Sequence, residues 1–104
     1  MTNLYYIENN GCDDTTHGLA RMSDEEFEKF KSIIENLNKN STYGCMPTIT
    51  VFKIDNGLIR PARDYDSSEC ILYMNDGEYA LGDSIYDWSF ETGLVYKEGV
   101  ERVI

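Results

Sequence analysis

The chain has 104 residues, a formal net charge of −10 from nineteen acidic and nine basic side chains, and a single histidine. Its 41% hydrophobic and 12% aromatic content is enough to build a hydrophobic core, which argues against a disordered acidic tail. The acidic balance disfavours direct binding to nucleic acid, because affinity for phosphate comes chiefly from lysine and arginine. We therefore predict a single folded domain over residues 1–104 that does not itself bind nucleic acid.

The sequence contains no recognisable targeting or membrane segment. The first ten residues, MTNLYYIENN, have no basic region followed by a long apolar run, and nowhere do eighteen apolar residues follow one another. The three cysteines, Cys12, Cys45 and Cys70, are far apart and form no CxxC pair, which favours free thiols in a reducing compartment. We expect a soluble cytoplasmic protein without a membrane partner.

The first elements in chain order are two strands and a helix. Residues 4–7 are apolar and aromatic and end in a polar NNG turn, which predicts a strand that pairs with Thr15–Met22. Residues 23–26 read SDEE, a capping box that predicts a helix over about 24–39. Apolar residues then recur every three or four positions, and we expect this stripe to face the core: Phe27, Phe30, Ile33, Ile34 and Leu37.

The second half of the sequence is typical of short strands. A strand at Thr48–Ile54 is followed by Asp-Asn-Gly, which predicts a hairpin into residues 58–59, and Asn-Asp-Gly at 75–77 predicts a second hairpin between residues 70–74 and 78–81. Residues 85–91 alternate, so Tyr86, Trp88 and Phe90 should share one face of a half-buried strand. Two further runs, 94–96 and 100–104, would complete a meander. The predicted fold class is α+β, with one amphipathic helix packed on a largely antiparallel sheet of five to seven short strands.

The stretch NNGCDDTTHG at residues 9–18 raises the question of a site. Cys12, His17 and one of the two aspartates Asp13 and Asp14, with Cys45 added, could in principle hold zinc, or Cys12 could act as a nucleophile with His17 as its base. The spacing matches no zinc template, and no hydrolase signature or oxyanion hole is evident. The sequence therefore favours a reverse turn, with no catalytic residue, metal or cofactor, and it predicts a protein that is not an enzyme.

The acidic residues are concentrated in the last third of the chain. Residues 64–104 contain ten acidic and two basic side chains, a net charge of −8. This segment is either a solvated face that keeps the protein soluble or a phosphate-like array that binds a basic groove. In the second interpretation the candidate partner-binding residues comprise six acids and two aromatic anchors: Asp64, Asp66, Glu69, Asp83, Asp87, Glu91, Tyr79 and Tyr86.

The runs YYIENNGCDDTT and NKNSTYGCMPTI resemble segments of small acidic, uncharacterised proteins of bacteriophages and prophages, over about residues 4–54. The resemblance implies a setting in which many short acidic proteins inhibit host defence, including anti-CRISPR proteins that occupy the DNA-binding surface of an effector nuclease. We therefore expect a protein-binding inhibitor that partly mimics DNA, with a basic-grooved host protein, such as a CRISPR effector nuclease, as its partner. The alternatives are a self-associating structural or accessory phage protein and a small cysteine-dependent enzyme.

Overall fold

The computed structural model of the chain describes residues 1–11, 15–40, 48–82 and 84–104. Within these residues it contains one α-helix and nine strands, and every strand pairing is antiparallel. The elements are β1 (Asn3–Asn10), β2 (Thr15–Met22), α1 (Asp24–Asn40), β3 (Thr48–Ile54), β4 (Ile59–Pro61), β5 (Leu72–Met74), β6 (Gly77–Leu81), β7 (Tyr86–Ser89), β8 (Gly93–Tyr96) and β9 (Val100–Arg102). The α+β class is confirmed, although the number of strands exceeds the predicted five to seven.

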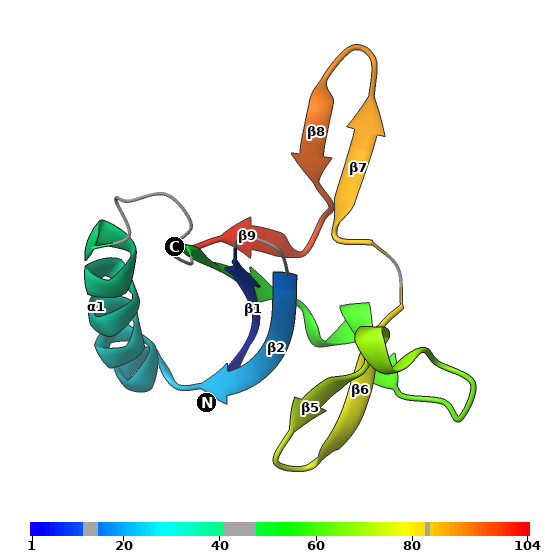
Figure 1. Ribbon diagram of the computed structural model, residues 1–104, viewed down its shortest axis with the longest axis horizontal. Coiled ribbons are helices and arrows are strands. Elements are labelled where there is room, and N and C mark those ends of the chain that lie inside the picture. Colours follow the sequence, from blue (N-terminus) through cyan, green and yellow to red (C-terminus); the bar gives the residue numbers. More distant parts are fainter. Residues whose placement is uncertain (12–14, 41–47, 83) are drawn as a thin grey trace.

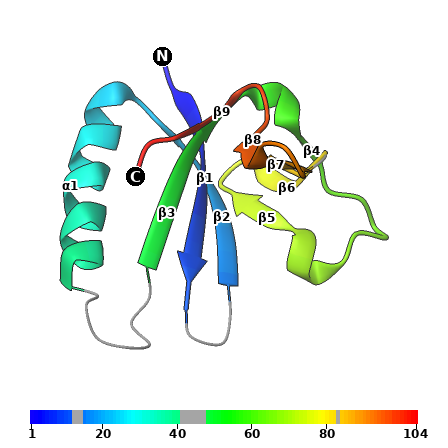
Figure 2. The ribbon, with the colours of Figure 1, turned by 90° about the horizontal axis from the view of Figure 1, so that it is seen from above.

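The strands form three sheets, ordered β2-β1-β3-β9, β4-β6-β5 and β7-β8. In the largest sheet β1 is an inner strand, and α1 lies on one side of this sheet and the β4–β6–β5 sheet on the other (Figure 2). On one face, the Tyr5 ring stacks on Phe27 of α1 with centroids 4.6 Å apart. On the other face, Leu4 and Tyr6 join a buried cluster that includes Leu72 of β5. This double coverage explains why residues 4–6 are all apolar or aromatic rather than alternating with polar residues.

The helix begins where the capping box predicts. The backbone N–H of Glu26 donates to the Ser23 hydroxyl over 3.2 Å, and the Ser23 N–H donates to the Glu26 carboxylate over 3.0 Å. The apolar stripe behaves only partly as expected, because Ile34 is buried whereas Ile33 is 60% and Leu37 51% exposed. The prediction that the whole stripe faces the core is wrong for these two residues, although α1 does contact β2 and β3.

The end of the helix is tied to β3 by one side-chain amide. The Asn38 Nδ2 donates to the Ile49 carbonyl over 2.7 Å, and the Ile49 N–H donates to the Asn38 Oδ1 over 2.8 Å. Within the described residues, β3 is paired at this point only on its β1 side, because β9 pairs with β3 from Phe52 to Ile54. The amide therefore takes the place that a neighbouring strand would occupy.

The two predicted hairpins have different outcomes. The hairpin around residues 75–77 is confirmed, with Met74 opposite Gly77 in the β5–β6 pair. The hairpin from β3 into residues 58–59 is wrong, because β3 pairs with β1 and β9 whereas β4 pairs with β6. Residues 56–58 form a short 3-10 helix in which the Leu58 N–H donates to the Asp55 carbonyl over 3.0 Å, and Gly57 has no positive φ. This turn sends the chain from one sheet to the next.

The last three strands do not form the expected meander. Among the strands that the structure describes, β7 and β8 pair only with each other, and β9 returns to the edge of the large sheet beside β3. The reversal between β8 and β9 contains Gly99 at a φ of +84°, with the Val100 N–H donating to the Lys97 carbonyl over 3.1 Å, as in a type II turn. The β7–β8 hairpin consequently stands away from the rest of the molecule (Figure 1).

Candidate protein-binding surface

We call the β7–β8 hairpin, residues 86–96, the arm. Its base is fixed to the core by backbone and by aromatic contacts. The Lys97 N–H donates to the carbonyl of buried Ile85 over 3.0 Å. The Phe52 ring packs edge-on against Tyr96 at 5.3 Å and Tyr86 at 6.2 Å between centroids. These contacts fix the start of β7 and the end of β8, and the rest of the arm projects outward.

The outer half of the arm exposes large apolar side chains. Trp88 lies opposite Leu94 in the register, and the two are 67% and 61% exposed, while Phe90 at the tip is 99% exposed. The sequence pattern correctly predicts a shared face for Tyr86 and Trp88, but the expected burial of Trp88 and Phe90 is wrong. Beyond the Tyr86–Tyr96 pair the strands project from the body, and no element of the described part of the chain covers this face.

The tip of the arm is a tight three-residue loop. Ser89 lies opposite Gly93, the Thr92 N–H donates to the Ser89 hydroxyl over 3.0 Å, and Gly93 has a φ of +71°. A type I turn followed by a left-handed glycine is a common way to close such a hairpin. A Cβ at Gly93 would lie 3.9 Å from the Trp88 ring, so the indole lies across this glycine. The loop holds Phe90 and Glu91 at the end of a preformed turn.

Two of the predicted acidic residues, Asp87 and Glu91, lie on the arm and are exposed. The Asp87 carboxylate is 3.8 Å from the ammonium of Lys97, which is half-buried, whereas the Asp87 side chain is exposed. Tyr86, predicted as an anchor for a partner, is instead half-buried at the base, with its hydroxyl 3.5 Å from the Glu8 carboxylate. Burial, with Glu8 nearby, raises the pKa of Tyr86. On the outer half of the arm, the exposed aromatic side chains are therefore Trp88 and Phe90.

The other predicted residues lie away from the arm. Asp64 and Glu69 are exposed in the segment between β4 and β5. Tyr79 on β6 is half-buried, and hydrogen bonding to the Asp76 carboxylate raises its pKa. Asp83 lies outside the described residues. The predicted set thus divides between two places instead of forming one array.

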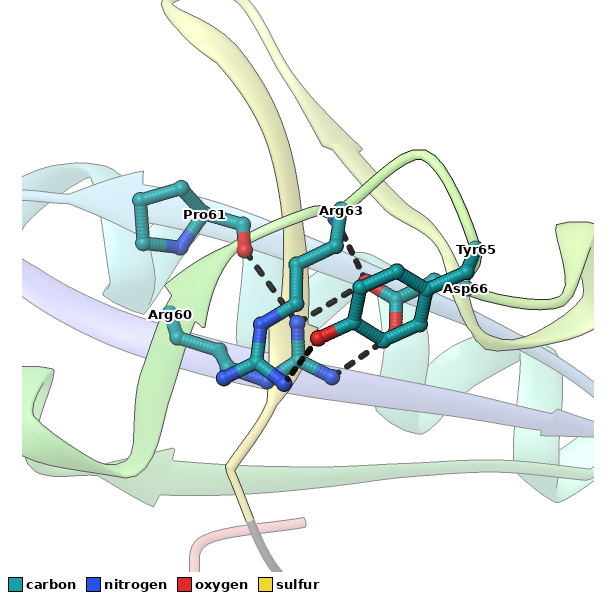
Figure 3. A network of polar contacts seen from close by, with 5 residues as sticks. All are labelled: Arg60, Pro61, Arg63, Tyr65 and Asp66. Carbon is teal, nitrogen blue, oxygen red and sulfur yellow. Dashed lines mark hydrogen bonds and ion pairs between the residues drawn. The ribbon is translucent and has the colours of Figure 1, made fainter.

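The Asp66 carboxylate is held in an ion pair within the protein and is not a free surface charge (Figure 3). Its carboxylate accepts two hydrogen bonds from the Arg60 guanidinium, at 2.8 and 2.9 Å, and one from the Arg63 backbone N–H at 2.6 Å. The Arg60 guanidinium, followed by the Arg63 N–H, holds the pKa of Asp66 far below its usual range. We therefore leave Asp66 out of the partner-binding surface, because its charge is already neutralised.

A cavity of about 480 Å³ lies between β1, β2 and the β4–β6–β5 sheet, and it is lined by the other side chains that could take part in a reaction. His17 lines it, and the His17 Nδ1 is hydrogen-bonded to the hydroxyl of Tyr6, whose pKa is raised by burial. Cys70, an exposed free thiol, lines the same cavity, a proximity that sequence spacing does not reveal. Of the earlier candidate ligands, Cys12, Asp13, Asp14 and Cys45 lie outside the described residues. Among the residues that the structure describes, no three of His, Cys, Asp and Glu gather as metal ligands.

The fold and the exposed arm define a small acidic α+β protein with one projecting aromatic hairpin. In the part of the chain that the structure describes, no helix is both long enough and apolar enough to cross a membrane. Comparison with protein-family models, with curated proteins and with solved structures finds no match. The functional argument therefore depends on the arm and on the charge distribution alone.

Proposed function

We propose that this protein is a protein-binding module that docks through its arm onto a basic, nucleic-acid-binding protein and thereby inhibits it. The observation that carries the proposal is the exposure of Trp88, Phe90 and Leu94 on one projecting hairpin. Contiguous exposed apolar surface is uncommon on soluble monomers and marks interaction sites. Tryptophan is also among the residues that most often dominate binding energy at interfaces.

The basic character of the partner follows from the charges around this apolar surface. Asp87 and Glu91 flank the aromatic residues on the arm, and residues 64–104 carry a net charge of −8. Such a surface attracts a basic groove over long range and accelerates encounter with it. A groove that is lined with lysine and arginine is most often a nucleic-acid-binding surface. In the bacteriophage setting that the sequence resembles, the module would block a host defence protein, such as a CRISPR effector nuclease.

The test combines site-directed crosslinking with competition. A photo-reactive phenylalanine analogue replaces Phe90, and nuclease-treated bacterial lysate supplies partners. Each crosslinked protein is identified, purified and tested for binding to a labelled DNA duplex. We expect the wild-type chain to displace the duplex, and we expect Trp88→Ala to weaken this competition at least about tenfold, the loss typical of a central aromatic contact.

Matched variants separate the two parts of the surface. Tyr73→Ala removes an exposed aromatic side chain from β5 and should leave competition unchanged. Neutralising Asp87 and Glu91 together should slow association more than it accelerates dissociation, and added salt should weaken binding by the wild type, since exposed charges are screened. Neutralising two exposed helix acids, Glu25 and Glu28, is the charge control. The proposal would be contradicted if Trp88→Ala still displaced the DNA duplex as well as the wild type does. It would also be contradicted if Tyr73→Ala weakened the displacement as much as Trp88→Ala does. Crosslinks only between copies of the chain would favour the self-associating alternative.

A further inference from the structure

The hydrogen-bond alternation of the arm shows which backbone groups point outward. The Lys97 N–H donates to the Ile85 carbonyl, and these residues are directly opposite in the register that places Tyr86 opposite Tyr96. In an antiparallel pair, hydrogen-bonded and non-hydrogen-bonded positions alternate. The Asp87–Val95 pair is therefore hydrogen-bonded, and the Tyr86–Tyr96 and Trp88–Leu94 pairs are not. At these non-bonded positions the N–H and C=O groups point away from the partner strand.

The two edges of the arm differ. On the β7 edge, the outward Tyr86 N–H is already satisfied by the Ser84 hydroxyl at 3.2 Å. On the β8 edge, the outward groups belong to Leu94 and Tyr96, and within the described residues β8 pairs with no strand other than β7. A two-stranded hairpin by itself is only marginally stable, and a third strand would satisfy the edge and extend the sheet. Among the described residues, the β7 edge keeps one unpaired outward N–H, that of Trp88, whereas the β8 edge presents two, so the β8 edge is the more open side of the arm.

We propose that the β8 edge receives an extended segment of the partner as a third, hydrogen-bonded strand. This inference rests on the proposed function and specifies how the arm would recognise its partner. Strand addition supplies affinity through main-chain hydrogen bonds, and alternate side chains of the added strand supply specificity. Side chains on one face of that strand extend the apolar surface of Leu94 and Tyr96, so we expect valine, isoleucine or leucine at alternate positions.

The remaining positions of the segment should be basic. The arm and the adjoining turn carry Asp87, Glu91 and Glu98 against Lys97, an excess of negative charge around the hairpin. A second copy of this chain would bring the same excess, and a net charge of −10 on each copy opposes their association. Charge complementarity therefore selects a basic extended segment of another protein as the occupant.

The probe is a synthetic peptide of alternating lysine and valine, seven residues long, and the measurement is residue-resolved amide hydrogen exchange by NMR. In the free protein, the amides of Leu94 and Tyr96 should exchange rapidly, whereas those of Val95 and Lys97 should be protected. With peptide at about ten times its dissociation constant, the exchange of the Leu94 and Tyr96 amides should slow by about tenfold. A fully N-methylated peptide of the same sequence cannot form the ladder and should give no such slowing.

A matched pair of variants tests the edge without changing the probe. Tyr96→Ala and Tyr96→Pro both lose the ring, but only the proline also removes the outward N–H, a loss that edge positions tolerate. Peptide binding should weaken further in Tyr96→Pro than in Tyr96→Ala, while protection of the Lys97 amide reports that the base of the arm remains formed. Equal binding of the methylated peptide, or no protection of Leu94, would overturn the inference.

Other outcomes separate this inference from the proposed function. Protection of the Leu94 and Tyr96 amides that grows with protein concentration, without peptide, would overturn the inference in favour of a second copy. If the peptide has no effect on Leu94 but Trp88→Ala still abolishes competition with DNA, strand addition is wrong and docking by side chains alone stands. If neither effect is found, both proposals fail.

Discussion

Replacing Gly99 by alanine should destabilise the protein through two separate costs. Gly99 has a φ of +84°, which costs about 1–2 kcal/mol for a residue with a Cβ atom. The Asp55 N–H donates to the Gly99 carbonyl over 2.9 Å, and this contact brings the two residues together. A Cβ at position 99 would lie 2.5 Å from the Asp55 Oδ2 and 2.9 Å from its Cγ. The Asp55 side chain must therefore move.

The loss in the free energy of unfolding depends on how easily the Asp55 side chain can move away. Overpacking typically costs about 1–3 kcal/mol, but Asp55 is exposed and its carboxylate can turn away, so we expect a total loss of about 2–3 kcal/mol for Gly99→Ala. The assay is urea unfolding followed by circular dichroism. The Asp55→Ala background removes the two closest atoms and leaves only the Cβ, at 3.3 Å. There the same substitution should cost only the positive-φ contribution.

Gly57→Ala is the control, because Gly57 has no positive φ and a Cβ there would meet no atom within 4 Å. It should cause no loss of stability. The reasoning is refuted if Gly99→Ala unfolds at the wild-type urea midpoint, or if its cost is the same with and without the Asp55 carboxylate. The second result would mean that the close approach at this turn contributes nothing.

Three further predictions concern single side chains. Trp88→Ala should change the free energy of unfolding by less than about 0.5 kcal/mol, because the side chain is mostly exposed, whereas Phe52→Ala in the core should cost about 3–5 kcal/mol in the same urea assay. Asn38→Ala leaves the Ile49 N–H and carbonyl without their partner, so we expect a loss of about 1–3 kcal/mol by urea unfolding and faster exchange of the Ile49 amide by NMR. Asp66→Asn should be less stable than wild type at neutral pH. Because the pKa of Asp66 is lower in the folded chain than in the unfolded one, the stability difference between wild type and Asp66→Asn is fully present above the ordinary pKa of 3.8 and should shrink as the pH falls below it. Urea midpoints at a series of pH values would measure this. A stability difference that persists unchanged in acid would contradict the ion-pair assignment.

Features encoded in a few adjacent residues could be predicted from the sequence. The start of α1 depends on two hydrogen bonds between Ser23 and Glu26, which are three positions apart. The β5–β6 hairpin depends on a short turn between neighbouring apolar runs. In both cases the residues that decide the structure are neighbours in the chain, so local patterns contain the necessary information.

Features decided by distant residues could not be predicted in this way. The Asn56-Gly57 pair is compatible both with a hairpin and with the observed 3-10 turn, and the choice depends on β9 occupying the edge of β3 beside Phe52. Likewise, the alternation in β7 predicts which side chains share a face but not whether another element covers it. Exposure of Trp88 follows from the length of the arm relative to the body, which no local pattern encodes.

Sequence patterns contain only part of the information that defines the candidate surface. Charge counting identified the acidic last third of the chain, and Asp87 and Glu91 do lie on an exposed element. It could not identify the ion pair between Asp66 and Arg60, because an acid's partner depends on how the loop folds back. The aromatic residues chosen as anchors, Tyr79 and Tyr86, are the half-buried ones, because a sequence gives residue type but not depth.

Trp88 is the only tryptophan of the chain, and it lies on the exposed arm rather than in the core. Its indole is surrounded mainly by water in the folded protein, as it is in an unfolded chain, so the intrinsic emission spectrum should shift little when urea unfolds the molecule. Insertion of the arm into an apolar site would instead move the emission to shorter wavelength and shield the indole from iodide quenching. The emission of Trp88 should therefore report binding at the arm and change little when the core unfolds.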